Sequence, residues 1–160
     1  MATRSTIWIK QKDGSLKGIY CHNDGYLANN GAILLNAFDD IKKIESLISL
    51  GNISSLGAYI EPIFSHKIHD FDNKQDDTVV SYARDRGEAL SLYSCKDFNS
   101  IDDYLEEYNY IFDLFNNTWY FFEDSEDELK ELTKEAILKE WDKSGYLYTR
   151  FAINILRELL

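Results

Sequence analysis

The residues with the most distinctive spacing are carboxylates. Asp102 and Asp103 are followed by Glu106 and Glu107, so the two pairs recur four residues apart and would line one flank of a helix. A row of carboxylates can imitate nucleic-acid phosphates for a channel lined by Lys and Arg. Nearby tyrosines could supply interface anchors. The predicted partner-binding surface comprises Asp102, Asp103, Glu106, Glu107, Asp113, Glu123, Asp124, Asp127 and Glu128, with Tyr104 and Tyr108.

The acidic charge is concentrated in one stretch of the chain. Residues 97–135 hold 13 Asp and Glu against two Lys, which accounts for the whole formal net charge of -11. Residues 1–96 hold 12 acidic and 11 basic side chains, and residues 136–160 hold three and four, so these parts nearly balance. Such a stretch repels nucleic acid and anionic membranes and attracts basic surfaces. The alternative interpretation is a solvated acidic face with favourable charge at a helix N-terminus.

A second group of polar residues could bind or convert a small ligand. Its first four members alternate along a strand and its end, so they share one face. A His–Asp pair can act as a general base, and Arg pairs bind phosphate or carboxylate. No nucleophile stands out, because the Cys21 side chain would point to the opposite face. The alternative interpretation is a structural cluster, in which an ion pair between Asp85 and an Arg side chain braces a turn. The predicted pocket comprises Tyr20, His22, Asp24, Tyr26, Arg84 and Arg86.

The histidines and glycines give little support for a metal or cofactor. His66 and His69 are three residues apart beside Asp70 and Asp72, a set that could ligate zinc on a helix or a tight turn. These residues fall in a polar loop without CxxC or HExxH, so we expect ordinary surface residues there. The glycines form neither GxGxxG nor GxxxxGK[ST]. We therefore expect no metal, no cofactor and no catalysis.

Length and composition indicate a single domain. A chain of 160 residues with 44% hydrophobic and 28% charged residues suits one ordinary core, which we place in residues 1–122, with a helical region over 123–160 packed on it. No apolar run predicts a signal peptide or a membrane span, so we expect a cytoplasmic protein. Two cysteines outside any CxxC pair, Cys21 and Cys95, indicate buried free thiols.

The hydrophobic pattern of the N-terminal half favours a hairpin followed by two short helices. Strand-like residues 6–11 and 16–22 flank Asp13 and Gly14, a hairpin turn signal. Residues 32–38 suit a short helix. A second helix would begin after Asp39 as its cap and stop at Gly51. Further strands are predicted over residues 78–83 and 89–94.

The C-terminal half predicts a second hairpin and a helical end. Ser100 could cap a short helix that runs through Glu107, and residues 108–115 and 118–122 flank an Asn-Asn turn. Ser125 and Glu128 fit a capping box, from which a helix should reach about Lys143. A last helix, with Leu147, Phe151, Ile155 and Leu159 on one face, could pair two copies of the chain. The predicted class is α+β with an antiparallel sheet.

A series of motifs over residues 1–88 carries a resemblance to a known family. MATRS at the start is followed by GIYCHNDGY over residues 18–26, by LISLGNISSLG over 47–57 and by YARDRGE over 82–88. This order resembles a widespread family of small proteins encoded by bacteriophages and prophages. Asn23 and Leu27 depart from the family pattern, in which Trp and Pro are frequent at the two positions. The resemblance implies an accessory protein in a bacterial host and lends no catalytic residues.

Together these observations predict a phage accessory protein that binds and inhibits a host defence protein, of the anti-CRISPR or anti-restriction type. Its acidic surface would imitate DNA, so the expected partner is a defence nuclease or another basic nucleic-acid-binding protein, and neither nucleic acid nor a membrane. Two alternatives stay open. One is a small enzyme or ligand-binding protein that uses the polar pocket, and the other is a structural protein that self-associates through its last helix.

Overall fold

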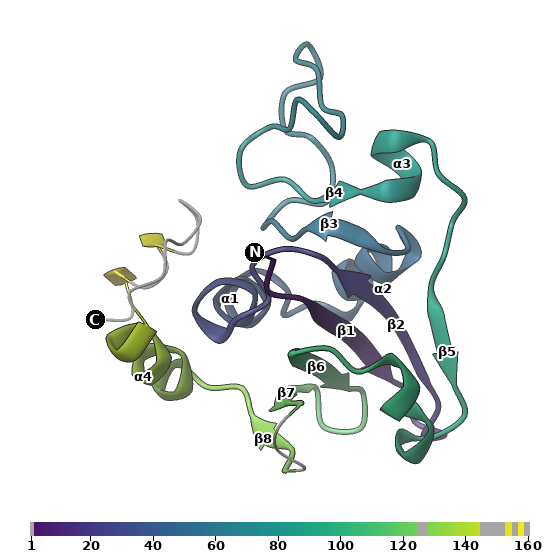
Figure 1. The fold of residues 1–160 in the computed structure, drawn as a ribbon, viewed down its shortest axis with the longest axis vertical. Coiled ribbons are helices and arrows are strands. Elements are labelled where there is room, and N and C mark those ends of the chain that lie inside the picture. Colours follow the sequence, from purple (N-terminus) through teal and green to yellow (C-terminus); the bar gives the residue numbers. More distant parts are fainter. Residues whose placement is uncertain (1, 125–127, 145–152, 155–156, 159–160) are drawn as a thin grey trace.

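A mixed eight-stranded sheet forms the centre of the computed structural model, which describes residues 2–124, 128–144, 153–154 and 157–158 (Figure 1). The strand order is β4-β3-β2-β1-β6-β7-β8, and β5 pairs with β2. The strands are β1 (Ser5–Lys10), β2 (Leu16–Cys21), β3 (Ile53–Ser55), β4 (Val80–Ser81), β5 (Tyr93–Cys95), β6 (Tyr108–Asp113), β7 (Thr118–Glu123) and β8 (Lys130–Glu131). The helices are the π-helix η1 (Leu27–Gly31), α1 (Ala32–Ala37), α2 (Ile41–Ser49), α3 (Tyr82–Arg86), the 3-10 helix η2 (Phe98–Tyr104) and α4 (Lys134–Ser144).

The α+β class is confirmed, but the sheet is mixed rather than antiparallel. β1 pairs antiparallel with β2 across the turn at Gly14, and β6 pairs antiparallel with β7 across the turn at Asn117; both turn residues have positive φ. β1 and β6, however, run parallel, with Ser5 opposite Tyr108. Parallel neighbours require a long crossover connection. The residues between β2 and β6, which include α1 and α2, provide it.

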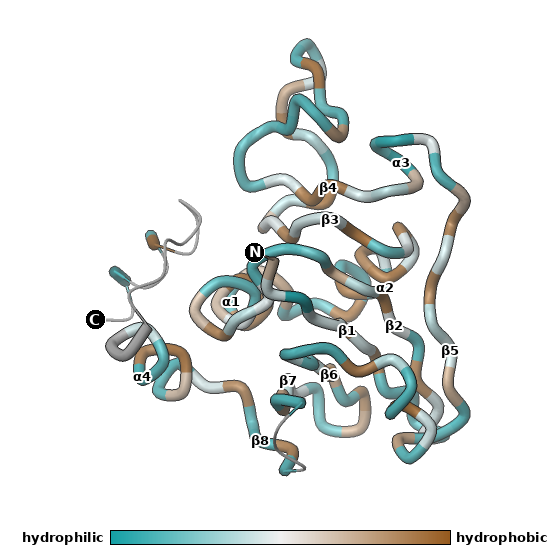
Figure 2. Tube along the Cα trace, in the orientation of Figure 1, coloured by the Kyte–Doolittle hydropathy of each residue, from teal (hydrophilic) through white to brown (hydrophobic). Residues whose placement is uncertain are grey.

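Strand alternation divides the interior into two layers. Ile7 and Ile9 of β1 face the larger cluster, which α1 and α2 cover. Trp8 faces the other side, where it contacts residues of β5 and η2 in a smaller aromatic cluster. In Figure 2 hydrophobic and hydrophilic stretches alternate along α2, as expected of a helix with one buried side. The buried side consists of Ile44, Leu47 and Ile48.

Two helix caps differ from those predicted. The carboxylate of Asp40, not of Asp39, accepts the N–H of Lys42 at 2.9 Å and starts α2. Similarly, Asp97 rather than Ser100 caps η2, because its carboxylate accepts both the N–H and the hydroxyl of Ser100. η2 ends at Tyr104, earlier than predicted, so Glu106 and Glu107 do not belong to a helix.

Three further predictions were wrong in the extent or type of the element. The strand expected over residues 78–83 is only β4, because the Ser81 hydroxyl accepts the N–H of Arg84 and starts α3. The strand expected over 89–94 begins at Tyr93. β8 pairs with β7 where a helix was predicted, and α4 starts later, at Lys134. Ser125 and the predicted face of Leu147, Phe151, Ile155 and Leu159 lie outside the described residues.

The described residues include no helix that is both long and apolar enough to span a bilayer. Both cysteines are buried free thiols, as predicted.

Candidate functional site

Five of the predicted carboxylates gather where β6 begins. The Nε atom of Arg4 lies 3.7 Å from Glu106 and 3.8 Å from Glu107, and the Arg4 N–H donates to the Glu107 carboxylate. The backbone carbonyl of Glu107 accepts the N–H of Asp124, which brings the end of β7 alongside. η2 ends just before Glu106 and supplies two more carboxylates. We call Asp102, Asp103, Glu106, Glu107 and Asp124 the acidic surface.

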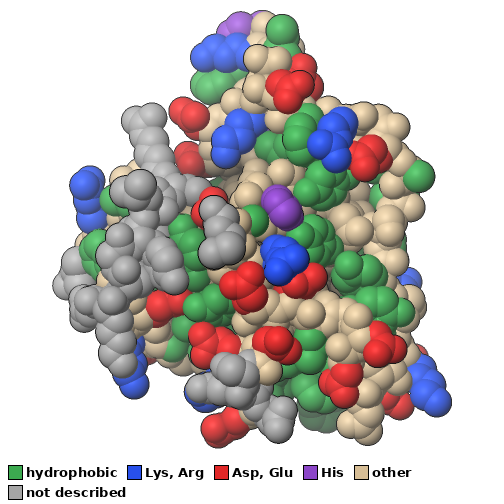
Figure 3. Space-filling view, in the orientation of Figure 1, with side chains coloured by type: hydrophobic (Ala, Val, Ile, Leu, Met, Phe, Trp, Pro, Cys, Tyr) green, Lys and Arg blue, Asp and Glu red, His purple; other side chains and the backbone are tan. Residues whose placement is uncertain are grey.

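The acidic surface is open to solvent. Asp102, Asp103 and Asp124 are exposed, and Figure 3 shows acidic side chains gathered over β6, β7 and their neighbours, with few basic ones among them. Among the residues that the structure describes, Arg4 is the one basic partner of these carboxylates in an ion pair, and its side chain is 51% exposed. A surface pair of this kind stabilises the fold little, and the negative charge is left largely uncompensated.

The other predicted carboxylates lie elsewhere. Asp113 is at the far end of β6, 4.0 Å from Lys10, and its carboxylate accepts the N–H of Phe115 in the turn. Glu123 pairs in register with Tyr108, so the two side chains share the face of the sheet on which Tyr108 contacts Glu140 of α4. Glu128 is exposed beyond β7, and Asp127 lies outside the described residues.

The two predicted tyrosine anchors are half-buried on opposite faces of the sheet. The ring centroid of Tyr104 is 4.6 Å from that of Tyr93 and 6.0 Å from that of Trp8, within the smaller cluster. Tyr108 donates its hydroxyl to Glu140 of α4 at 2.8 Å. Both rings therefore hold the layers together and are not presented beside the carboxylates.

Glu140 attaches α4 to the core, a role that no pattern in the sequence indicated. One carboxylate oxygen accepts the Tyr108 hydroxyl, and the other accepts the N–H of Ala28 in η1 at 2.8 Å. Burial, joined by the nearby Glu123 carboxylate, raises the pKa of Glu140, although both hydrogen bonds act in the other direction.

We expect Glu140→Ala to lower the free energy of unfolding by about 1–3 kcal/mol, because two buried donors lose their acceptor. Glu140→Gln keeps an acceptor oxygen and should cost less. Since folding raises the pKa of Glu140, its contribution is fully present below the ordinary value of 4.5 and is lost as the pH rises through the folded value. Wild type should therefore gain stability relative to Glu140→Gln on acidification, measured by urea unfolding. Parallel pH profiles would contradict this.

The predicted polar pocket is divided into separate groups. The Tyr20 hydroxyl lies 2.7 Å from Nδ1 of His22, as their alternation suggested. Asp24 accepts the hydroxyl of Tyr26, whose ring is buried in the larger cluster. The two arginines belong to other contacts around α3. The six residues therefore do not line one cavity.

Arg84 belongs to a buried cluster with Asp85 and His69. Arg84 donates to both Asp85 oxygens, at 2.9 and 3.0 Å, and His69 Nε2 lies 3.5 Å from Asp85. The N–H of Gln75 donates to Nδ1 of His69, which fixes this ring nitrogen as an acceptor. The side chain of His69 is only 2% exposed, so the prediction of a surface histidine was wrong. Among the described residues, no three candidate ligands gather to hold a metal ion.

The candidate nucleophiles near His22 are not activated. Burial raises the pKa of Cys21 to about 11 and, together with the nearby Glu106, that of Tyr20 to about 12. Nucleophilic cysteines have a lowered pKa instead. These groups therefore suit a structural or binding role better than covalent catalysis.

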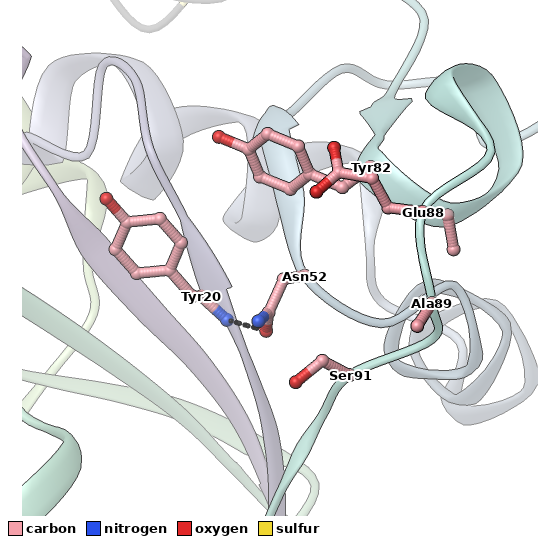
Figure 4. A pocket seen from close by; sticks show the side chains of 7 residues that line it. Tyr20, Asn52, Tyr82, Glu88, Ala89 and Ser91 are labelled. Atoms are coloured by element: carbon pink, nitrogen blue, oxygen red, sulfur yellow. Dashed lines mark hydrogen bonds between the residues drawn. The ribbon is translucent and has the colours of Figure 1, made fainter.

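A cleft of about 240 Å³ opens beside Tyr20, between β2 and the exposed segment 87–92 (Figure 4). Asn52 organises it: its Oδ1 accepts the N–H of Tyr20 at 2.9 Å, its N–H donates to the Ser91 carbonyl, and its carbonyl accepts the N–H of Tyr82. The predicted polar pocket included Tyr20 alone of these residues; the YARDRGE motif was the available signal for Tyr82, Ala83 and Glu88. The lining residues are Tyr20, Asn52, Tyr82, Ala83, Glu88, Ala89 and Ser91.

Comparison of the chain with protein-family models, with curated proteins and with solved structures found no match. The resemblance of residues 1–88 to phage-encoded proteins stays a prediction.

Proposed function

We propose that this chain binds a basic, nucleic-acid-binding protein and occupies the groove in which that protein would hold nucleic acid. The observation that carries the proposal is the acidic surface. Its five carboxylates, from η2 and from the segments next to β6 and β7, have one ion-pair partner among the described residues, Arg4, which contacts Glu106 and Glu107. An uncompensated set of this kind attracts Lys and Arg side chains and repels nucleic acid and anionic lipid.

The carboxylates have fixed positions, which favours a specific partner. The N–H of Tyr108 donates to the carbonyl of Arg4, and β1 and β6 pair over their whole length, so Glu106 and Glu107 are held directly before the start of β6, an interior strand of the sheet, rather than on a free tail. A rigid surface loses little conformational freedom on binding. Electrostatic complementarity of this kind contributes mainly to specificity and to the rate of association.

The partner that fits the resemblance of residues 1–88 is a bacterial defence nuclease. In this proposal the chain is an inhibitor of the anti-CRISPR or anti-restriction type that acts in the bacterial cytoplasm by occupying a nucleic-acid site, without catalysis. The acidic surface would then compete directly with the phosphates of the nuclease's own substrate.

The test is a pull-down of the tagged chain from a lysate of defence-carrying bacteria at low and high salt. A nuclease should be captured at low salt and shed at high salt, because screening weakens exposed charge pairs. A variant of the acidic surface should bind at least about tenfold more weakly. It carries Asp102→Asn, Asp103→Asn, Glu106→Gln, Glu107→Gln and Asp124→Asn.

A matched control removes the same number of charges from exposed carboxylates outside the acidic surface. It should retain binding, since a general loss of net charge is not the proposed cause. The proposal fails if the acidic-surface variant is folded by circular dichroism and still captures and inhibits the nuclease as wild type does. The control carries Glu45→Gln, Glu61→Gln, Asp72→Asn, Asp76→Asn and Glu135→Gln.

A further inference from the structure

We infer that the cleft beside Tyr20 binds a guanidinium group, carried by an arginine side chain or by a small arginine derivative. This site is distinct from the acidic surface, and binding there goes beyond the proposed function. It would hold whether or not the acidic surface binds a nuclease.

The cleft combines aromatic rings with a carboxylate. Tyr20 and Tyr82 stand on either side of the opening, and Glu88 lies beside Tyr82 (Figure 4). The faces of tyrosine rings attract cations, and a carboxylate pairs with a guanidinium through charge-assisted hydrogen bonds. The lining includes no Lys or Arg, although Arg86 lies against two of its residues, Tyr82 and Glu88.

The chain already binds one guanidinium with the same residues. Cζ of Arg86 lies 4.0 Å from the ring centroid of Phe71 and 4.9 Å from that of Tyr82, and its Nε pairs with Glu88. Tyr82 and Glu88 therefore show the geometry that recognises a guanidinium. The cleft offers a second position against the same pair, with the Ser91 hydroxyl as a further acceptor.

The surrounding charge favours a cation further. Glu106 is close enough to Tyr20 to contribute, after burial, to the raised pKa of that phenol, while Arg4 opposes the effect. Burial raises the pKa of both tyrosines that line the cleft, so their side chains stay neutral at physiological pH.

The size of the cleft limits the ligand. At about 240 Å³ it is smaller than the roughly 300–1,000 Å³ typical of sites for drug-sized molecules. It suits one planar cationic group and part of its stem, and excludes a nucleotide or a folded peptide. An isolated arginine side chain has the required shape and charge.

We would titrate isotope-labelled protein with L-argininamide and, as a neutral control of equal shape, with L-citrullinamide. Saturable NMR shifts are expected for the side-chain amide of Asn52 and the backbone amides of Ala89 and Ser91, with argininamide only. Glu88→Gln should raise the dissociation constant about tenfold, because a hydrogen bond to a charged group is lost. Glu61→Gln, which removes an exposed charge outside the cleft, should leave the dissociation constant unchanged.

Arg86→Gln sharpens the test, because Arg86 competes for the same residues. This variant should bind argininamide more tightly than wild type, an outcome that a purely structural role of Glu88 and Tyr82 would not produce. Tighter binding of an end-blocked Gly-Arg-Gly peptide than of argininamide would indicate a protein side chain, and the reverse a free small molecule. Shifts that do not saturate, or equal shifts with citrullinamide, would overturn the inference.

Discussion

Asp85→Asn is expected to lower the free energy of unfolding by about 3 kcal/mol, because removal of one charge from a buried ion pair leaves its partner uncompensated. The Asp85 side chain is 3% exposed. It accepts two hydrogen bonds from Arg84 and one, at 2.7 Å, from the N–H of Ser81 at the start of α3. An amide cannot accept all three, so the start of α3 and the position of Arg84 should both be lost.

The pH dependence of this effect has a definite sign. Burial acts to raise the pKa of Asp85, but the hydrogen bonds from Arg84 and Ser81, with the nearby charge of Arg84, outweigh it and hold the pKa below the ordinary value of 3.8. The contribution of Asp85 is therefore present above pH 3.8 and is lost as the pH falls through the folded value. Urea unfolding at pH 7 and pH 3 should show the difference between wild type and Asp85→Asn shrinking at the lower pH.

Asp72→Asn is a suitable control, because Asp72 is exposed in the loop that carries His69, and its replacement should change the free energy of unfolding by less than about 0.5 kcal/mol. An Asp85→Asn variant as stable as Asp72→Asn would show that the buried cluster does not hold the loop. The cluster also reaches the carbonyls of Ile60 and Val79 through Arg84. The cluster therefore holds the segment between Ile60 and Val79 in place, and this segment includes the exposed hydrophobic side chains of Ile63, Phe64 and Ile68.

Local signals in the sequence were sufficient for the elements that local chemistry determines. The alternation around Gly14 indicated the pairing of β1 with β2, and an Asp next to an amphipathic run indicated α2 within one residue. The parallel pairing of β1 with β6 was not accessible in this way. It joins segments about a hundred residues apart, as the bond between Thr6 and Asn109 illustrates, and depends on packing of the whole chain.

The same distinction between local and long-range contacts applies to the candidate sites. The concentration of charge in residues 97–135 was visible in the sequence, but the pairing of Glu106 and Glu107 with Arg4 was not, because Arg4 lies over a hundred residues earlier. The alternation of Tyr20 and His22 was a sound guide because neighbours on one strand face share a side. His69 is buried because Asp85 and Gln75 provide partners, which spacing alone cannot show.

Gly18→Ala is expected to destabilise the fold by about 3 kcal/mol, the upper end of the usual cost of overpacking a core. Gly18 is opposite Trp8 in the β1–β2 register, and an added Cβ would lie 2.3 Å from Cε3 of the Trp8 ring. The ring cannot easily move, because its Nε1 donates to Thr6 at 2.7 Å and Thr6 donates to Asn109. In a strand without this contact, Gly→Ala would normally stabilise the fold. A decrease in the free energy of unfolding would therefore by itself identify the clash.

A double-mutant cycle with Trp8→Leu isolates this clash, because removal of the ring should make Gly18→Ala nearly neutral. If Gly18→Ala lowers the free energy of unfolding equally in both backgrounds, the Trp8 ring is not the cause.

The contact between Gly18 and Trp8 also bears on the proposed function. Trp8 contacts Tyr93 and Tyr104, and Tyr104 is the last residue of η2, immediately before the segment that carries Glu106. A displaced Trp8 should therefore shift η2 and weaken the partner binding that we propose for the acidic surface, without changing any of its carboxylates.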